Sequence, residues 1–570
     1  MASGADGVNE PDSTNAHPDS MVTPGHKFDQ DAEPSPGVPT AVQGPSEPDL
    51  LGGAADDEDS AAVPTSGADE KSGVAPASST RLFNLIRNLG AVRRWRWYRE
   101  NAKDRSEIWR SHDPEENEAS RLPIDENLSV PAFWVTELYT PSTVSGLLEG
   151  IRKLGWDRSR SRGDSLAKWM SDVREGRSAG WTSLGLVSPV NDRHFMHDRV
   201  AELPPGVKAA LPELMSLTPS ITALTICFIL DDASAMAVNK PLRDDYQTYS
   251  SRDPLLRRRD LVGHVLWGRD VRLGRTIHSP RFQRRDAAAN CLSRLEADCT
   301  RWVEASLPGA FASGLRGGLY PTAMLIVSEQ TRPLKDSQVL QAFEGLGIDH
   351  EFDSWESLEW PGIRMVLPRG WRGEDLRLRF TGKRSDAFPP ERGYPEPESN
   401  WTAAQRTDDK VPGLLSRWAL SCLLDGYHQM LSAQRDRSAQ KTANLPVRDL
   451  RRLRNLVRKD VYDILLSSSE IRGFAKSKRG YRYNVLEMSY VRVTAGKPKI
   501  ELVEQLEQGQ IARAKQVADE ARLFLSTATA STDITQVISN IRIQRWIGIA
   551  TVFSLAVAAA ALIIAISASR

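Results

Sequence analysis

The chain has 570 residues, with 74 basic and 74 acidic side chains that give a formal net charge of zero. Its four cysteines (Cys227, Cys291, Cys299 and Cys422) are scattered, which excludes a disulfide framework and a CxxC motif. The net charge of the whole chain does not describe its parts, because acidic and basic segments cancel each other.

Residues 1–80 contain fifteen Asp or Glu and two Lys, so this segment has a net charge of −13. It is rich in Pro, Gly, Ser and Ala, and Phe28 is its only aromatic residue. A segment of this kind buries too little apolar surface to offset chain entropy, so we predict a disordered acidic tail. Its first residues, "MASGADGVNEPDS", show no basic or apolar signal region, so we expect the bulk of the chain to stay in the cytoplasm.

Residues 81–110 predict a basic amphipathic helix, because apolar residues recur at helical spacing between arginines. Its apolar stripe could pack on the domain that follows, or lie in the interface of a membrane that contains anionic lipid. Nucleic-acid binding through interleaved Arg and Trp is a third and less favoured interpretation. The stripe is Leu82, Leu85, Ile86, Leu89 and Val92.

Residues 130–383 predict an α+β or mixed α/β cytosolic domain. Short β-prone runs are "VPAFWVTELY", "TALTICFIL", "TAMLIVSE", "GIRMVL" and "LRLRF". Patterns typical of helices cover residues 142–155, 205–217 and 283–305.

The remainder of the chain reads as a linker followed by helices. Residues 384–412 are rich in Pro and charge and predict the linker. We expect a helical region over 413–500 and a long stalk helix over 501–545 with an imperfect heptad-like stripe typical of a coiled coil. This stripe is Leu502, Leu506, Val517, Ala521, Phe524, Ala528, Ile538 and Ile541.

Residues 546–568 carry no charged side chain, and a helix of this length spans roughly 33 Å, enough for a hydrocarbon core. Arg542, Arg545 and Trp546 stand where the membrane interface is expected. We therefore predict a single-pass, tail-anchored membrane protein. Ala550, Ser554 and Ala558 recur at four-residue spacing, which favours a homo-oligomer through close helix approach.

This layout, a mixed domain on a helical stalk that enters a membrane, resembles the CorA magnesium channels in outline. Those proteins have two spans separated by a Gly-Met-Asn motif. This sequence predicts one span and contains no such motif, so the resemblance does not extend to membership of that family.

The segment 252–285 holds ten Arg and three Asp, a net charge of +7 that calls for anionic partners. Local carboxylates, anionic lipid, a phosphorylated ligand or the protein's own acidic tail could supply the negative charge, and nucleic acid is less favoured. The candidate anion-binding residues are Arg257, Arg258, Arg259, Arg269, Arg272, Arg275, Arg284 and Arg285.

Other chemistry is weakly indicated. His194 and His197 form an HxxH pair without an evident third ligand, and Ser165 with Lys168 match SxxK without its partner motifs. Asp231 and Asp232 follow a β-prone run, where carboxylates either bind metal or phosphate or cap the next turn. We therefore predict no metal and no cofactor.

Two classes of function remain open. The favoured hypothesis is a membrane-anchored binding protein, either a scaffold or a signalling platform. The alternative is a membrane-tethered enzyme, hydrolase-like, with its active site in the mixed domain. The high Arg to Lys ratio, 57 to 17, also points towards a bacterial source.

Overall fold

The computed structural model describes residues 110–157, 165–177, 180–191, 199–252, 275–334, 340–348, 354–368, 375–389, 399–441, 460–491 and 499–568. The chain divides into two units, Met1–Ser79 and Thr80–Arg570, and every described residue belongs to the second. The predicted acidic tail and all but the last residue of the predicted basic helix therefore lie outside the described residues.

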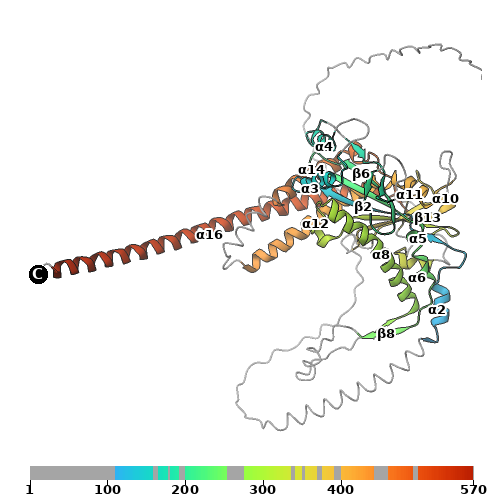
Figure 1. The fold of residues 1–570 in the computed structure, drawn as a ribbon, viewed down its shortest axis with the longest axis horizontal. Helices are drawn as coiled ribbons and strands as arrows, with labels where there is room; N and C mark the ends of the chain where they lie inside the picture. Colours follow the sequence, from blue (N-terminus) through green and yellow to red (C-terminus); the bar gives the residue numbers. More distant parts are fainter. Residues whose placement is uncertain are drawn as a thin grey trace, which may run out of the picture. The chain divides into compact units, whose positions relative to one another are not determined.

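A large mixed sheet organises the described part of the chain (Figure 1). Its strand order is β14-β11-β12-β13-β10-β2-β7-β6-β4-β5, with β1 paired to β10 and β3 paired to β6. The pairs β10–β13 and β4–β5 are parallel, and the other pairs in this sheet are antiparallel. The strands are β1 (Leu128–Ser129), β2 (Ala132–Tyr139), β3 (Trp181–Ser183), β4 (Val187–Pro189), β5 (Arg199–Ala201), β6 (Val207–Ser216), β7 (Thr222–Leu230), β10 (Thr322–Ser328), β11 (Ser354–Glu356), β12 (Ile363–Val366), β13 (Arg377–Lys383) and β14 (Ser489–Tyr490), and a separate hairpin joins β8 (Tyr249–Arg252) to β9 (Arg275–His278).

The helices flank this sheet or extend from it. They are α2 (Asp113–Ser120), α3 (Val144–Lys153), α4 (Leu166–Arg174), α5 (Asp232–Ala235), α6 (Asn239–Arg243), α8 (Pro280–Ser306), α9 (Leu340–Phe343), α10 (Arg384–Ala387), α11 (Asn400–Asp408), α12 (Val411–Lys441), α14 (Tyr462–Lys476), α15 (Lys478–Tyr481) and α16 (Leu502–Ala568), with 3₁₀ turns η1 (Leu315–Gly318) and η2 (Glu344–Leu346). A mixed α/β fold with a large sheet and many helices is thus confirmed.

The central strands are buried along their whole length. Every residue of β2, β7 and β10 is buried, as expected for near-continuous apolar runs covered on both faces. On one face, Phe228 of β7 meets Trp302 of α8 edge to face, with ring centroids 5.8 Å apart. On the other face, Trp134 of β2 donates its indole N–H to Asp408 at the end of α11, 2.8 Å away. The β-prone runs predicted from the sequence are confirmed here.

Helix α8 confirms the predicted helix at 283–305 and extends it to Pro280. Pro280 at the first turn lacks an N–H that a helix would leave unpaired, so it fits the start of the helix. Ala288, Leu292, Cys299 and Val303 are buried at helical spacing and form the face that packs on the sheet.

The prediction of a helix over 205–217 was wrong, because this segment forms strand β6. Its Ala, Leu, Glu and Met residues are good helix formers, but antiparallel pairing with the fully buried β7 overrides that local preference. A register shift between Val207 and Ala209 interrupts the ladder, and beyond it Ala210, Pro212 and Leu214 alternate towards the interior.

The segment expected to be a linker, 384–412, contains two helices. The short α10 begins at Arg384, and α11 buries Thr402, Ala403, Ala404 and Thr407. Ser399 caps α11 by accepting the N–H of Thr402. This helix packs on β7 of the sheet, although the Pro-rich composition of the segment had suggested a linker.

Helix α12 covers the start of the region expected to be helical over 413–500, and the structure also describes residues 460–491 and 499–500 of that region, with α14 and α15. The first half of α16 packs against α12 and α14. Its buried residues include a series at spacings of three and four, namely Val503, Glu507, Gln510, Ala514, Val517, Ala521 and Phe524, and Leu502 and Leu506 of the predicted stripe are buried as well. The heptad-like stripe of the stalk is therefore occupied within this chain as far as Phe524.

Helix α16 continues without a break into the apolar segment Ile543–Ala565, which is long and apolar enough to cross a membrane. This was the one such helix found within the described residues, and its large apolar side chains are exposed, with Trp546 72% and Phe553 72% accessible. The prediction of one C-terminal apolar helix that continues a helical stalk is confirmed.

Candidate functional site: an arginine-lined pocket

Most of the arginine-rich segment lies outside the described residues. Arg257, Arg258, Arg259, Arg269 and Arg272 lie outside the described residues, and of Arg275 the structure describes only its place at the start of β9. Arg284 and Arg285 lie on the first half of α8 and have different surroundings.

Arg284 is buried and serves the fold. Its guanidinium donates to Asn117 Oδ1 at 2.8 Å, to the carbonyl of Asp244 at 2.9 Å and to the hydroxyl of Ser120. Burial lowers the pKa of Arg284, and the Tyr246 ring lies 5.5 Å from its guanidinium carbon. The side chain therefore ties α8 to α2 and to the segment that follows α6.

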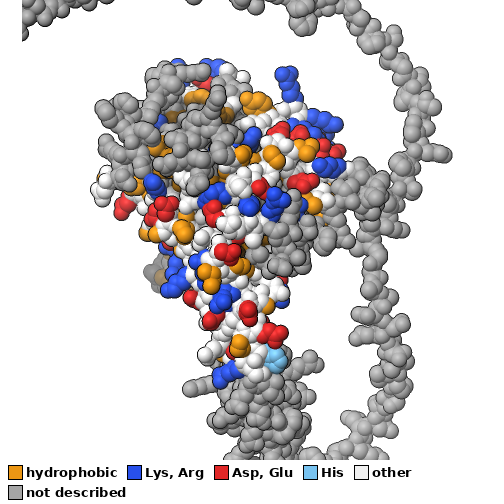
Figure 2. Space-filling model, turned by 90° about the vertical axis from the view of Figure 1, so that its right-hand side faces the viewer, with side chains coloured by type: hydrophobic (Ala, Val, Ile, Leu, Met, Phe, Trp, Pro, Cys, Tyr) orange, Lys and Arg blue, Asp and Glu red, His pale blue; other side chains and the backbone are white. Residues whose placement is uncertain are grey.

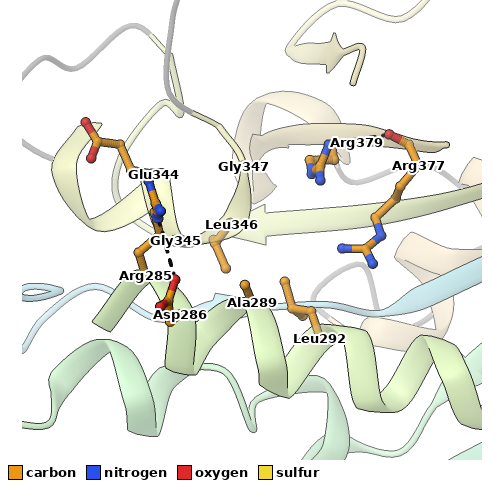
Figure 3. Close-up of a pocket in the computed structure, with 10 residues that line it drawn as sticks. All are labelled: Arg285, Asp286, Ala289, Leu292, Glu344, Gly345, Leu346, Gly347, Arg377 and Arg379. Atoms are coloured by element: carbon orange, nitrogen blue, oxygen red, sulfur yellow. Dashed lines mark hydrogen bonds and ion pairs between the residues drawn. The ribbon is translucent and has the colours of Figure 1, made fainter. Parts of the chain in front are cut away.

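Arg285, the next residue, lines a cavity of about 530 Å³ between α8, the α9–η2 segment and β13 (Figure 3). Ala289 and Leu292 of α8 and Leu346 of η2 contribute apolar surface to this cavity. Its size falls in the range of small-molecule sites, and it combines apolar lining with a few charged groups.

Arg377 and Arg379 form the β13 side of the cavity. They are two residues apart on one strand, so both project from the same face of the sheet. Figure 3 shows the Arg377 side chain directed from β13 towards α8. Arg377 forms an ion pair with Glu296 of α8, and Arg379 forms one with Asp375.

The geometry around Arg379 depends on a glycine. Gly347, at φ +74°, lies so close that a Cβ placed there would be 2.6 Å from Arg379 Nε and 2.8 Å from its Cζ. Any side chain at this position would displace the guanidinium, and positive φ disfavours one in any case. The glycine in the turn after η2 therefore leaves room for the Arg379 guanidinium.

The two guanidinium groups keep unused donors. Among the described residues, the Nε atoms of Arg377 and Arg379 are buried without a hydrogen-bond partner. Burial, and then the charge of neighbouring Arg379, lower the pKa of Arg377 to about 9, so it remains charged at neutral pH.

The opposite end of the cavity carries acids. Asp286 lies 3.8 Å from the Arg285 guanidinium, and Glu344 is held by the guanidinium of Arg281 through Nε at 2.9 Å. Figure 3 shows Asp286 and Glu344 at one end and the two β13 arginines at the other. Arg285 lies at the same end as these two acids, so each end of the cavity has both basic and acidic groups.

The remaining sequence candidates have structural roles or fall outside the description. Asp231 caps α5 by accepting the N–H of Ser234 at 2.7 Å, and Asp232 accepts from the Asn400 side chain at 3.1 Å. Ser165 caps α4 through the N–H of Lys168. His194 and His197 lie outside the described residues, within which no group of three potential metal ligands was found.

Three buried or half-buried carboxylates that the sequence did not single out have raised pKa values. Burial raises the pKa of Asp408 to about 7 and that of Glu137 to about 7. Burial, followed by the charges of Asp408 and Asp409, raises the pKa of Glu213 to about 8. Glu137 accepts the backbone N–H groups of Phe311 and Ala312, which gives it a structural role in the segment after α8.

The surface of this region is mixed in charge. On the face drawn in Figure 2, basic and acidic side chains are interspersed over the described residues. At the start of the apolar segment of α16, Arg545 and Trp546 are exposed, while the structure describes only the helical backbone of Arg542.

Comparison with known proteins gives little guidance. No family model matches the chain, and no curated protein matches it. Among solved structures, the CorA magnesium transporter from Methanocaldococcus jannaschii aligns at 12% identity over 41% of this chain and 74% of that chain, with a TM-score of 0.19.

Proposed function

We propose that this protein is a single-span membrane protein that acts by binding, with the mixed α/β domain on the cytoplasmic side as its binding platform. The observation that carries the proposal is helix α16. One half of it packs on α12 and α14, and the same uninterrupted helix supplies the apolar segment Ile543–Ala565. A ligand or partner bound by the domain would thereby be held at the membrane.

The proposed orientation follows from the flanking charges. Arg542 and Arg545 immediately precede the apolar segment, and positively charged flanks favour the cytoplasmic side. Trp546, 72% exposed, stands at the depth where aromatic side chains favour the interface.

We extend the proposal to self-association through the span. Ala550, Ser554 and Ala558 form a stripe of small residues on an exposed helix, which permits close approach of a second copy. The stalk contributes to such a contact only beyond Phe524, because its earlier apolar positions are buried against α12 and α14.

The test is removal of the apolar segment. A variant that stops before Trp546 should leave the membrane fraction, whereas the full chain should stay in it through an alkaline carbonate wash. Protease added outside intact cells should leave the domain of the full chain uncut. Retention of the truncated variant in washed membranes would contradict the proposal, and crosslinking in detergent that finds only monomer would contradict self-association.

A further inference from the structure

We infer that the pocket between α8, η2 and β13 binds a phosphorylated small molecule, with the phosphate at Arg377 and Arg379 and an apolar body along α8. This rests on the proposed function, because it specifies the ligand class of a protein that acts by binding. The anion-binding candidates taken from the sequence included Arg285, at the edge of this pocket, but neither of the two β13 arginines.

Arg377 and Arg379 each pair with a carboxylate, and each also has a buried N–H group without an acceptor among the described residues. The residue Arg379 is 7% exposed, and its Nε, like that of Arg377, has no partner among the described residues. A buried N–H without an acceptor is costly, so such groups are nearly always paired. An oxyanion in the cavity would accept from both and would also reduce the repulsion between the two guanidinium groups.

Two neighbouring guanidinium groups favour phosphate over carboxylate as the ligand group. A carboxylate has two oxygens and matches the fork of a single guanidinium. A phosphate monoester offers three terminal oxygens and close to two negative charges, so it can accept from two arginines at once. The placement of Arg377 and Arg379 two residues apart on one strand presents two guanidinium groups to one wall of the cavity.

The cavity beyond the two arginines indicates what the rest of the ligand is. Ala289, Leu292 and Leu346 provide an apolar surface beside the arginines, and Asp286 and Glu344 line the far end. A cavity of about 530 Å³ exceeds what inorganic phosphate needs. A molecule with a phosphate, a flat body of low polarity and outer hydrogen-bond donors fits this order of groups, and a nucleoside monophosphate has that layout.

The experiment is calorimetric titration of the full chain in detergent with adenosine and uridine 5′-monophosphates, the two nucleosides and inorganic phosphate. We expect at least one monophosphate to bind with a dissociation constant below about 1 mM. Its nucleoside and inorganic phosphate should each bind at least about tenfold more weakly, because each lacks one part of the contact.

Two pocket variants and one control separate this site from nonspecific attraction. Arg379→Gln should weaken binding at least about tenfold, since it removes charge-assisted donors while its partner Asp375 stays 44% exposed. Ala289→Phe should also abolish binding by filling the cavity without changing any charge. Arg301→Gln, on the same helix at a 69% exposed position paired with Asp298, should bind as the wild type does.

The inference is overturned if no monophosphate binds, or if nucleoside and monophosphate bind equally. Equal binding of inorganic phosphate would overturn the apolar body subsite, and loss of binding in Arg301→Gln to the same extent as in Arg379→Gln would overturn the assignment to this pocket. Thermal unfolding of each variant checks its fold. Membrane fractionation of the same preparations distinguishes the two proposals, because a membrane-bound protein without ligand binding refutes this inference alone.

Discussion

Asp408→Asn should make the protein more stable at pH 8 and leave its stability nearly unchanged at pH 4. Asp408 ends α11 against β2, and burial raises its pKa from 3.8 to about 7. Because the folded-state pKa lies above the unfolded one, the folded protein favours the neutral carboxyl. That contribution to stability is complete below about pH 4 and is lost as the pH rises through 7.

The magnitude follows from the shift. About three pKa units correspond to about 4 kcal/mol, and the partial exposure of Asp408 reduces the expected cost to about 2–3 kcal/mol at pH 8. The amide keeps an oxygen for the Trp134 N–H, which donates to the carboxylate at 2.8 Å in the wild type. Removing the charge should also lower the pKa of Glu213, which the Asp408 carboxylate helps to raise.

The assay is urea denaturation in detergent, followed by tryptophan fluorescence, at pH 4, 5, 6, 7 and 8. The difference in unfolding free energy between Asp408→Asn and the wild type should grow from pH 4 to about pH 7 and level off by pH 8. Asp409→Asn removes the same charge from an exposed neighbour and should change stability by less than about 1 kcal/mol. A difference for Asp408→Asn that does not change with pH would refute the reasoning.

Gly413→Ala in α12 should cost about 3 kcal/mol in thermal unfolding, because a Cβ there would lie 1.8 Å from the carbonyl oxygen of Asn484. Gly473→Ala is the control, since a Cβ there meets no atom within 4 Å, and it should be neutral or stabilising. Equal effects of the two substitutions would contradict this prediction. The Arg513–Asp425 pair joins α16 to α12 with side chains 18% and 19% exposed, so a double-mutant cycle should give a coupling of about 1 kcal/mol or more, against nearly zero for the exposed Arg522–Asp519 pair.

The sequence predicted best those elements whose local pattern and tertiary surroundings agree. The runs that became β2, β7 and β10 are apolar and β-branched, and both faces of these strands are covered. In β6 the two disagreed, because the residues favour a helix while pairing with β7 requires an extended chain. The residues of 205–217 do not by themselves indicate that this segment pairs with β7.

The pocket was not predicted because three separate segments form it. One local signal existed, since Arg377 and Arg379 stand at alternate positions of the β-prone run "LRLRF", where a buried strand rarely places charge. Glu296, the partner of Arg377, and Gly347, which lies beside Arg379, could be recognised only in three dimensions. The stalk stripe was likewise visible, but the sequence did not identify α12 and α14 as its partners.

Because helix α16 is unbroken, the number of residues between the domain and the apolar segment determines the rotation and distance of one relative to the other. At about 100° and 1.5 Å per residue, one residue inserted beyond Phe524 would turn the apolar segment by about 100° relative to the domain. Seven inserted residues would nearly restore the original angle while adding about 10 Å of length. The number of residues in α16 therefore sets the rotation of the apolar segment relative to the domain, and insertions of one and of seven residues separate the effect of rotation from that of distance.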